Sequence, residues 1–244
     1  MRGAVNAERN ETRLRLPRRA VYGRRVIPLR DTVPSARVPV VNYLIIAANG
    51  AVFLYELSLG RHVDVFLANY GLVPRDFAVV NLFTSMFLHA GWLHIFGNML
   101  YLYIFGDNVE DRLGHVRYLA FYLLCGVAAG AGHALTQPYS DMPVVGASGA
   151  IAGVSGAYFL FFPTARVVTL VFFFFIQVVE IPAVFFLAIW FIGQVASGVA
   201  TLGTRASNGG VAVWAHVSGF LAGCVLGPLL RRRTVDGTPA FGQR

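Results

Sequence analysis

The sequence predicts an all-α membrane protein, built as a bundle of six transmembrane helices. Three observations lead to this fold class. Of the 244 residues, 56% are hydrophobic and only 13% are charged, which is too apolar a composition for an ordinary soluble domain. Six apolar windows are long enough to cross the hydrocarbon core of a bilayer. The basic residues gather outside these windows, near the two ends of the chain.

The six windows follow one another along the chain with short connections. They lie at about 41–59, 92–109, 117–136, 146–163, 181–202 and 211–230. A further apolar patch at 167–179 is too short to span the bilayer, and we expect it to form a loop or the start of the fifth helix. The sequence shows no fixed-period repeat, so one membrane domain over 40–230 is expected, flanked by two tails.

The charge distribution predicts the topology. All 20 basic residues are arginines; ten of them precede Val38, and three more form the run Arg231–Arg233. Basic residues beside a span mark the cytoplasmic side, so the tails at 1–39 and 231–244 are both expected in the cytoplasm, the first of them disordered. Attraction to anionic lipid explains the basic tail better than nucleic-acid binding. No organelle address is visible, which favours a bacterial inner membrane.

Four polar side chains fall inside the spans at a similar depth. His94 and Asn98 lie near the start of the second span, Ser148 near the start of the fourth, and His216 near the start of the sixth. In this topology these three spans all begin on the outer side. Burying polar groups in lipid is costly and usually serves a function, so this convergence indicates a site in the outer part of the bilayer.

Small residues indicate that the fourth and sixth spans pack closely. The sixth carries Ala215, Gly219, Gly223 and Gly227 at intervals of four, and the fourth carries Gly149, Gly153 and Gly156. Such spacing forms a groove in which helix backbones approach each other. Ser148 and His216 border the two small-residue faces, so their side chains are expected within hydrogen-bond reach.

A serine beside a histidine is suited to nucleophilic catalysis. The imidazole takes the hydroxyl proton, and the alkoxide attacks a carbonyl carbon. The tetrahedral oxyanion then needs donors, and the Ser148 N–H, His94 and Asn98 are candidates, while Gly146 and Gly149 leave room for a substrate. Each residue alone also has a structural explanation: serine as packing, histidine as a donor to a carbonyl, and Asn98 as a bridge between helices.

The motifs around these residues resemble those of the rhomboid intramembrane serine proteases. The family's first loop and second helix are similar to TSMFLHAGWLHIFGNMLYLYIFGDNVEDRLG at 84–114, its GxSG motif to GASGAIAG at 146–153, and its sixth-helix histidine motif to AHVSGFLAG at 215–223. The resemblance implies a rhomboid-like six-helix bundle with a water-filled cavity open to the outside. It assigns Ser148 as nucleophile, His216 as general base, and His94 and Asn98 as oxyanion stabilisers.

Other positions match the family outside the catalytic set. His89 resembles a histidine that helps to hold the first loop, and Glu110 with Arg112 resembles an ExR pair, which we expect at the membrane interface. The chain departs from the family at Val80 and Asn81, where many members have Trp-Arg. It departs again at Ala152, where some members stack an aromatic residue on the catalytic histidine, so His216 must be positioned in another way.

The remaining features carry no separate chemistry. The resemblance implies that the fifth span, which contains Gln194, is a lateral gate for a substrate helix. The clusters Phe159–Phe162 and Phe172–Phe175 are expected to face lipid or the interface. We expect no metal and no cofactor, and the cysteines Cys125 and Cys224 lie inside spans and suggest no disulfide.

The leading function is therefore endoproteolysis of transmembrane segments in other membrane proteins, within the lipid bilayer and with no nucleic-acid partner. Two other functions remain open: a non-catalytic rhomboid-like protein that binds client helices, and a small six-span transporter. Internal repeats or paired broken helices are typical of such transporters, and neither is visible. The sequence leaves the oligomeric state unknown.

Overall fold

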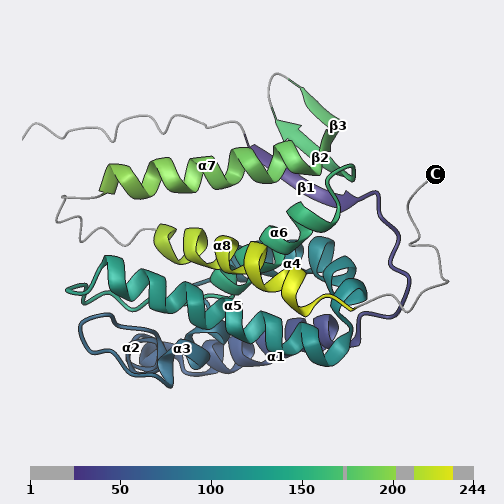
Figure 1. Cartoon of the computed structure of the whole chain (residues 1–244). Coiled ribbons are helices and arrows are strands. Elements are labelled where there is room, and N and C mark those ends of the chain that lie inside the picture. Colours follow the sequence, from purple (N-terminus) through teal and green to yellow (C-terminus); the bar gives the residue numbers. More distant parts are fainter. Residues whose placement is uncertain (1–24, 173–174, 202–211, 233–244) are drawn as a thin grey trace, which may run out of the picture.

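The computed structural model describes residues 25–172, 175–201 and 212–232. The described residues are mostly helical, with one small sheet (Figure 1). The helices are α1 (Val40–Ser58), α2 (Val63–Tyr70), α3 (Asn81–Thr84), α4 (Trp92–Leu113), α5 (His115–Thr136), α6 (Ser148–Phe161), α7 (Ala183–Thr201) and α8 (Val213–Leu230), with 3-10 turns η1 (Gly60–His62) and η2 (Ser85–Phe87). The strands are β1 (Arg25–Asp31), β2 (Arg166–Phe172) and β3 (Ile176–Pro182).

The longer helices lie in the windows expected to be spans. Four of them, α1, α5, α7 and α8, have the length and hydropathy of a membrane-crossing helix. Helix α6 is apolar but has only 14 residues, and the 22-residue α4 carries several charged residues near its end. The chain is thus an integral membrane protein with at least these four candidate spans among the described residues.

Helix α6 forms the centre of the bundle. Every residue from Gly149 to Tyr158 is buried, which fits a helix that is apolar on all sides. Helices α4, α5 and α8 pack around it. Figure 1 shows α7 on one side of these helices and α1 on the other. Of the four candidate spans, α7 is the least buried within the protein, with 17% of its most apolar window buried against 39% for α8.

Glycines bring α6 and α8 into direct backbone contact, as the sequence predicted. A Cβ atom placed on Gly223 would lie 1.9 Å from the carbonyl oxygen of Gly153, and one on Gly156 would lie 2.2 Å from the carbonyl oxygen of Phe220. Any side chain at these positions would force the two helices apart. The close approach fixes the relative height of the first turns of α6 and α8, where Ser148 and His216 lie.

The patch at 167–179 is neither a loop nor part of the fifth helix, because it forms the hairpin β2–β3. The sheet is antiparallel with order β1-β2-β3, and β2 pairs with β3 in the register Val168 with Glu180. Valine, isoleucine and threonine dominate these strands, and such β-branched residues favour extended structure. The fold is therefore mostly helical and not purely all-α.

Part of the N-terminal segment expected to be disordered also belongs to the sheet. Strand β1 pairs antiparallel with β2, with Ile27 opposite Leu170. The carboxylate of Asp31 accepts hydrogen bonds from the hydroxyl of Tyr158, at 2.5 Å, and from the Asn108 side chain, at 2.8 Å. Burial raises the pKa of Asp31 above its ordinary value, although the hydrogen bond from Tyr158 opposes the shift. Residues 1–24 of the tail lie outside the described residues.

Glu110 is buried within the protein, with 1% of its surface exposed. Its carboxylate accepts the backbone N–H groups of Val41, at 3.0 Å, and Asn42, at 2.7 Å. These two groups belong to the first turn of α1 and have no partner within the helix. Glu110 therefore caps α1 from α4. Arg112 lies 4.8 Å from the ring centre of Phe162 in a cation–π contact.

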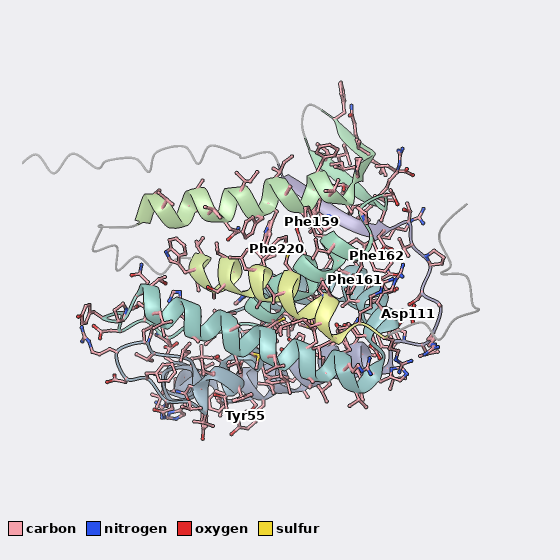
Figure 2. The ribbon with its side chains drawn as sticks, viewed as in Figure 1. Tyr55, Asp111, Phe159, Phe161, Phe162 and Phe220 are labelled. Atoms are coloured by element: carbon pink, nitrogen blue, oxygen red, sulfur yellow. The ribbon has the colours of Figure 1, made fainter. Side chains whose placement is uncertain are left out.

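The aromatic cluster at the end of α6 faces the protein more than expected. Figure 2 labels Phe159, Phe161 and Phe162 beside Phe220 of α8. Phe162 is buried, and the rings of Phe159 and Phe220 lie 5.9 Å apart. In the second cluster, Phe175 is 76% exposed, as expected for an interfacial residue, while residues 173–174 lie outside the described ranges.

Candidate active site

Ser148 and His216 meet between the first turns of α6 and α8. The Oγ atom of Ser148 lies 2.7 Å from Nε2 of His216, which is a good hydrogen-bond distance. His216 is 7% exposed, so little water competes for its ring. The backbone contacts between α6 and α8 hold the two side chains in this arrangement. The geometry suits proton transfer from the hydroxyl to the imidazole.

His94 and Asn98 lie beside the loop that precedes Ser148. A Cβ atom placed on Gly146 would lie 2.7 Å from the His94 ring and 3.6 Å from Nδ2 of Asn98. Gly146 has a φ of 125°, which favours glycine, and its N–H donates to the carbonyl oxygen of Ser85 at 2.9 Å. The structure thus brings all four predicted polar residues to one end of the bundle.

Both residues have a donor to offer at this loop. Nδ1 of His94 accepts the N–H of Ala90 at 3.4 Å, so a neutral His94 carries its proton on Nε2. Nδ2 of Asn98 is buried and has no hydrogen-bond partner among the described residues. Ser148 is the first residue of α6, so its own N–H has no partner within the helix. His94 and Asn98 thus offer two donors beside Gly146, and the backbone of Ser148 offers a third.

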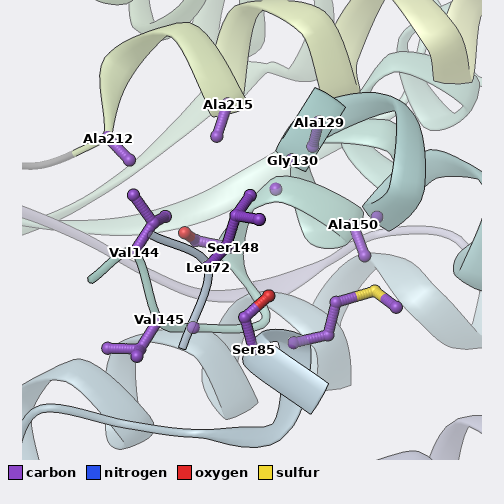
Figure 3. A pocket seen from close by; sticks show the side chains of 14 residues that line it. Leu72, Ser85, Ala129, Gly130, Val144, Val145, Ser148, Ala150, Ala212 and Ala215 are labelled. Carbon is purple, nitrogen blue, oxygen red and sulfur yellow. The ribbon is translucent and has the colours of Figure 1, made fainter. Parts of the chain in front are cut away.

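A small cavity adjoins the serine. Its volume is about 20 Å³, which is room for about one water molecule. Figure 3 shows Ser148 with other residues that line the cavity. They include Leu72, Ser85, Ala129, Gly130, Val144, Val145, Ala150, Ala212 and Ala215. The cavity lies between the serine loop and the beginning of α8, next to the nucleophile candidate.

His89 contacts the site through His94. The two rings lie 5.1 Å apart in an edge-to-face arrangement. The backbone N–H of His89 donates to the buried carboxylate of Glu56 at 3.1 Å. Glu56, on α1, therefore fixes the start of the loop that leads into α4. The ring of His89 in turn packs against the ring of His94.

The departure at Val80 and Asn81 has a structural explanation. Asn81 is buried, and its Nδ2 donates to the carbonyl oxygens of Gly71, at 2.8 Å, and Asn69, at 3.2 Å. The Asn81 amide therefore ties α3 to the end of α2. Val80 is 62% exposed and takes no part in that connection.

Two residues that contact His216 were not identified from the sequence as part of the site. Oε1 of Gln194 lies 2.8 Å from Nδ1 of His216. The ring of Trp190 lies 5.7 Å from the imidazole and is tilted by 35° to it. Trp190 and Gln194 are four residues apart and so share one face of α7. That spacing is visible in the sequence, but an apolar helix does not reveal which face it turns toward α8.

The chain is similar in sequence to several curated proteins. The chain is 34% identical over 124 residues to the putative rhomboid protease YdcA of Bacillus subtilis, covering 49% of this chain and 61% of that protein. It is 33% identical over 124 residues to the rhomboid protease GluP of Bacillus subtilis, covering 49% and 24%. It is 29% identical over 133 residues to the rhomboid protease AarA of Providencia stuartii, covering 46% and 47%.

The matches thus span less than two thirds of the length of these relatives. A family model for the rhomboid domain matches residues 76–233. That range covers more than half of the chain and contains Ser148, His216, His94 and Asn98. The chain belongs to the rhomboid family.

Proposed function

We propose that this protein is an intramembrane serine endopeptidase, which cleaves peptide bonds in or near transmembrane segments of other membrane proteins. The observation that carries the proposal is the 2.7 Å contact between Ser148 Oγ and His216 Nε2. Relatives named as rhomboid proteases support it. Non-catalytic relatives would keep the bundle without needing this contact.

The first half of the reaction forms an acyl-enzyme. His216 Nε2 takes the proton of the Ser148 hydroxyl while Oγ bonds to the carbonyl carbon of the substrate. The tetrahedral intermediate carries its negative charge on the former carbonyl oxygen. When the intermediate collapses, the C–N bond breaks and the imidazolium gives its proton to the leaving amine. Ser148 is then esterified and His216 is neutral again.

Water completes the reaction. A water molecule in the cavity beside Ser148 gives a proton to His216 and attacks the ester carbon. In the second tetrahedral intermediate the C–Oγ bond breaks, the imidazolium of His216 returns its proton to Oγ, and the carboxylic acid product is released. The cavity of about 20 Å³ supports this step because it can hold one such molecule. No cofactor takes part in this mechanism.

The oxyanion of both intermediates needs hydrogen-bond donors. The backbone N–H of Ser148, Nε2–H of His94 and the Asn98 amide are the donors that we assign to it. The unpaired Asn98 Nδ2 supports the assignment, because a buried donor without a partner is costly unless it serves the reaction. In other serine proteases, loss of one such donor costs about 3 kcal/mol of transition-state stabilisation.

The substrate is a helix that must be opened locally. A peptide bond inside a helix is shielded by its own hydrogen bonds, so residues that weaken helices are expected near the cleavage site. We further propose that six helices, α1 and α4–α8, cross the bilayer. This places both tails in the cytoplasm and the site on the outer side, in a bacterial inner membrane. The arginine-rich ends of the chain support this orientation.

Cleavage by matched variants tests the proposal. The protein is reconstituted in liposomes with single transmembrane segments that join two soluble reporter domains. We expect cleavage by the wild type and none by Ser148→Ala or His216→Ala. Ser155→Ala is the control, because Ser155 is a buried serine on the same helix, two turns beyond Ser148. This variant should cleave the substrate at the wild-type rate. Equal cleavage by wild type and Ser148→Ala would rule out the proposed nucleophile.

A further inference from the structure

Both ring nitrogens of His216 have partners, and the partners come from different helices. Nε2 faces Ser148 of α6 at 2.7 Å, and Nδ1 faces Oε1 of Gln194 of α7 at 2.8 Å. The imidazole is therefore held between two polar side chains, one on each side of the ring. We propose that Gln194 is a positioning residue, which sets the orientation and the tautomer of His216. This inference rests on the proposed function.

The role of Gln194 follows from the position of the imidazole proton. A neutral imidazole has one N–H and one lone pair on its two nitrogens. To take the proton of Ser148, Nε2 must present the lone pair, so Nδ1 must carry the hydrogen. That hydrogen needs an acceptor, and the only acceptor atom of a glutamine side chain is Oε1. The observed contact joins these two atoms.

The opposite orientation of the amide would give an inactive site. If Gln194 turned its NH₂ group toward His216, Nδ1 would have to accept and the imidazole proton would move to Nε2. Nε2–H would then donate to Ser148, and the hydroxyl would have no base to take its proton. Gln194 thus favours the reactive tautomer without itself accepting a proton. When the proton passes from Ser148 to Nε2, the Oε1 dipole also stabilises the imidazolium that forms.

A second contact from the same helix supports the assignment. Trp190 lies one turn before Gln194 on α7, and its ring packs against the imidazole at 5.7 Å. Helix α7 therefore contacts both the edge and the face of His216. On α6, the position from which some rhomboid proteins stack an aromatic residue on the histidine is Ala152. This residue is 1% exposed, and its side chain is too small to stack on the ring. The position of the base thus depends on α7, which is the least buried candidate span.

Three substitutions separate positioning from packing. Gln194→Met keeps the length and bulk of the side chain but removes the acceptor, while Gln194→Glu keeps an acceptor oxygen. Gln177→Met is the control, since Gln177 is exposed on β3. In the liposome assay we expect Gln194→Met to lower kcat about 10- to 100-fold, with KM within threefold of wild type. Gln194→Glu should keep kcat within about threefold, and Gln177→Met should not change it.

The results can contradict the inference separately from the function. If Gln194→Met cleaves at the wild-type rate while Ser148→Ala is inactive, Gln194 has no positioning role. An equal loss of kcat in Gln194→Met and Gln194→Glu would also overturn the positioning role, because a side chain that keeps the acceptor oxygen should keep kcat. If Ser148→Ala cleaves as well as wild type, the proposed function itself fails.

A spectroscopic measurement does not require cleavage. Nitrogen NMR of the protein labelled at histidine, with His216→Ala as the reference for assignment, reports which ring nitrogen carries the proton. We expect the proton on Nδ1 in the wild type and a larger share of the Nε2–H tautomer in Gln194→Met. A wild-type proton on Nε2, or no change in Gln194→Met, would contradict the proposed role of Gln194.

Discussion

Gly219 of α8 lies against the backbone of Gly149 of α6, one residue beyond the candidate nucleophile. A Cβ atom on Gly219 would be 2.1 Å from the carbonyl oxygen of Gly149, which is well inside van der Waals contact. His216 lies three residues before Gly219, on the same side of α8. The distance between Ser148 and His216 therefore depends on the absence of a side chain at Gly219.

This contact predicts a loss of both stability and activity in Gly219→Ala. The new methyl group meets a backbone atom that cannot rotate away, so we expect a loss of about 1–3 kcal/mol from overpacking. The shift of α8 should also lower kcat. Gly50→Ala is the control, since a Cβ at Gly50 of α1 meets nothing within 4 Å. A Gly219→Ala protein with wild-type thermal stability and kcat would show that the helices are less tightly apposed.

Gly146→Ala should damage the site more than the fold. The substitution combines a φ of 125° with a Cβ atom 2.7 Å from the His94 ring, so the ring or the serine loop must move. We expect kcat to fall at least tenfold. Gly60→Ala is the control, because Gly60 has a φ of 52° but open space around its Cβ position. It should lose about 1 kcal/mol of stability from backbone strain and keep its kcat.

Removing the cap on α1 should affect stability alone. Glu110→Ala leaves two N–H groups of α1, the half-buried one of Val41 and the buried one of Asn42, without their acceptor, which should cost about 1–3 kcal/mol. Glu180→Ala provides the comparison, because Glu180 is exposed on β3 and lies 3.7 Å from Arg166; such surface pairs contribute about 0–1 kcal/mol. Thermal unfolding can be followed with a thiol-reactive dye, since Cys125 is fully buried in the fold. Equal melting temperatures for the two variants would contradict the capping role.

The junction between the sheet and α6 should respond to pH through Asp31. Burial raises the pKa of Asp31, so the folded protein binds this proton more tightly than the unfolded chain does. The contribution of Asp31 to stability is therefore greatest when the carboxyl is protonated, and it decreases as pH rises through the raised pKa. Asp31→Asn removes this dependence but keeps an oxygen that accepts from Tyr158.

We expect the melting temperature of wild type to fall relative to Asp31→Asn between pH 4 and pH 8. Asp76→Asn, at an exposed carboxyl, should show no comparable trend against wild type. A constant difference between wild type and Asp31→Asn across this range would exclude a raised pKa at Asp31.

The sequence contained enough information to predict the central contact of the site. Ser148 and His216 border glycine faces of regular spacing, and such faces specify which helices approach and at what height. The polar residues near the starts of three spans were also recognisable, because an apolar background makes them stand out. The assigned roles of these residues in catalysis stay predictions.

Other contacts depend on information that a single sequence does not carry. The rotation of α7 decides whether Gln194 faces His216 or lipid, and apolar residues on all sides of that helix leave the rotation open. The pairing of β1 with β2 joins segments more than 130 residues apart. The arginines in β1 make this segment look like part of a basic tail and not like a strand. The capping of α1 by Glu110 likewise joins residues 68 and 69 positions apart.

The most direct test of the central claim is covalent labelling of the serine. A fluorophosphonate, which reacts with activated serine hydroxyls, is added to the protein in liposomes, and the modified residue is located by mass spectrometry. We predict modification at Ser148 in the wild type and its loss in His216→Ala. Equal modification of Ser148 in wild type and His216→Ala, or modification only at another residue, would contradict a serine activated by His216.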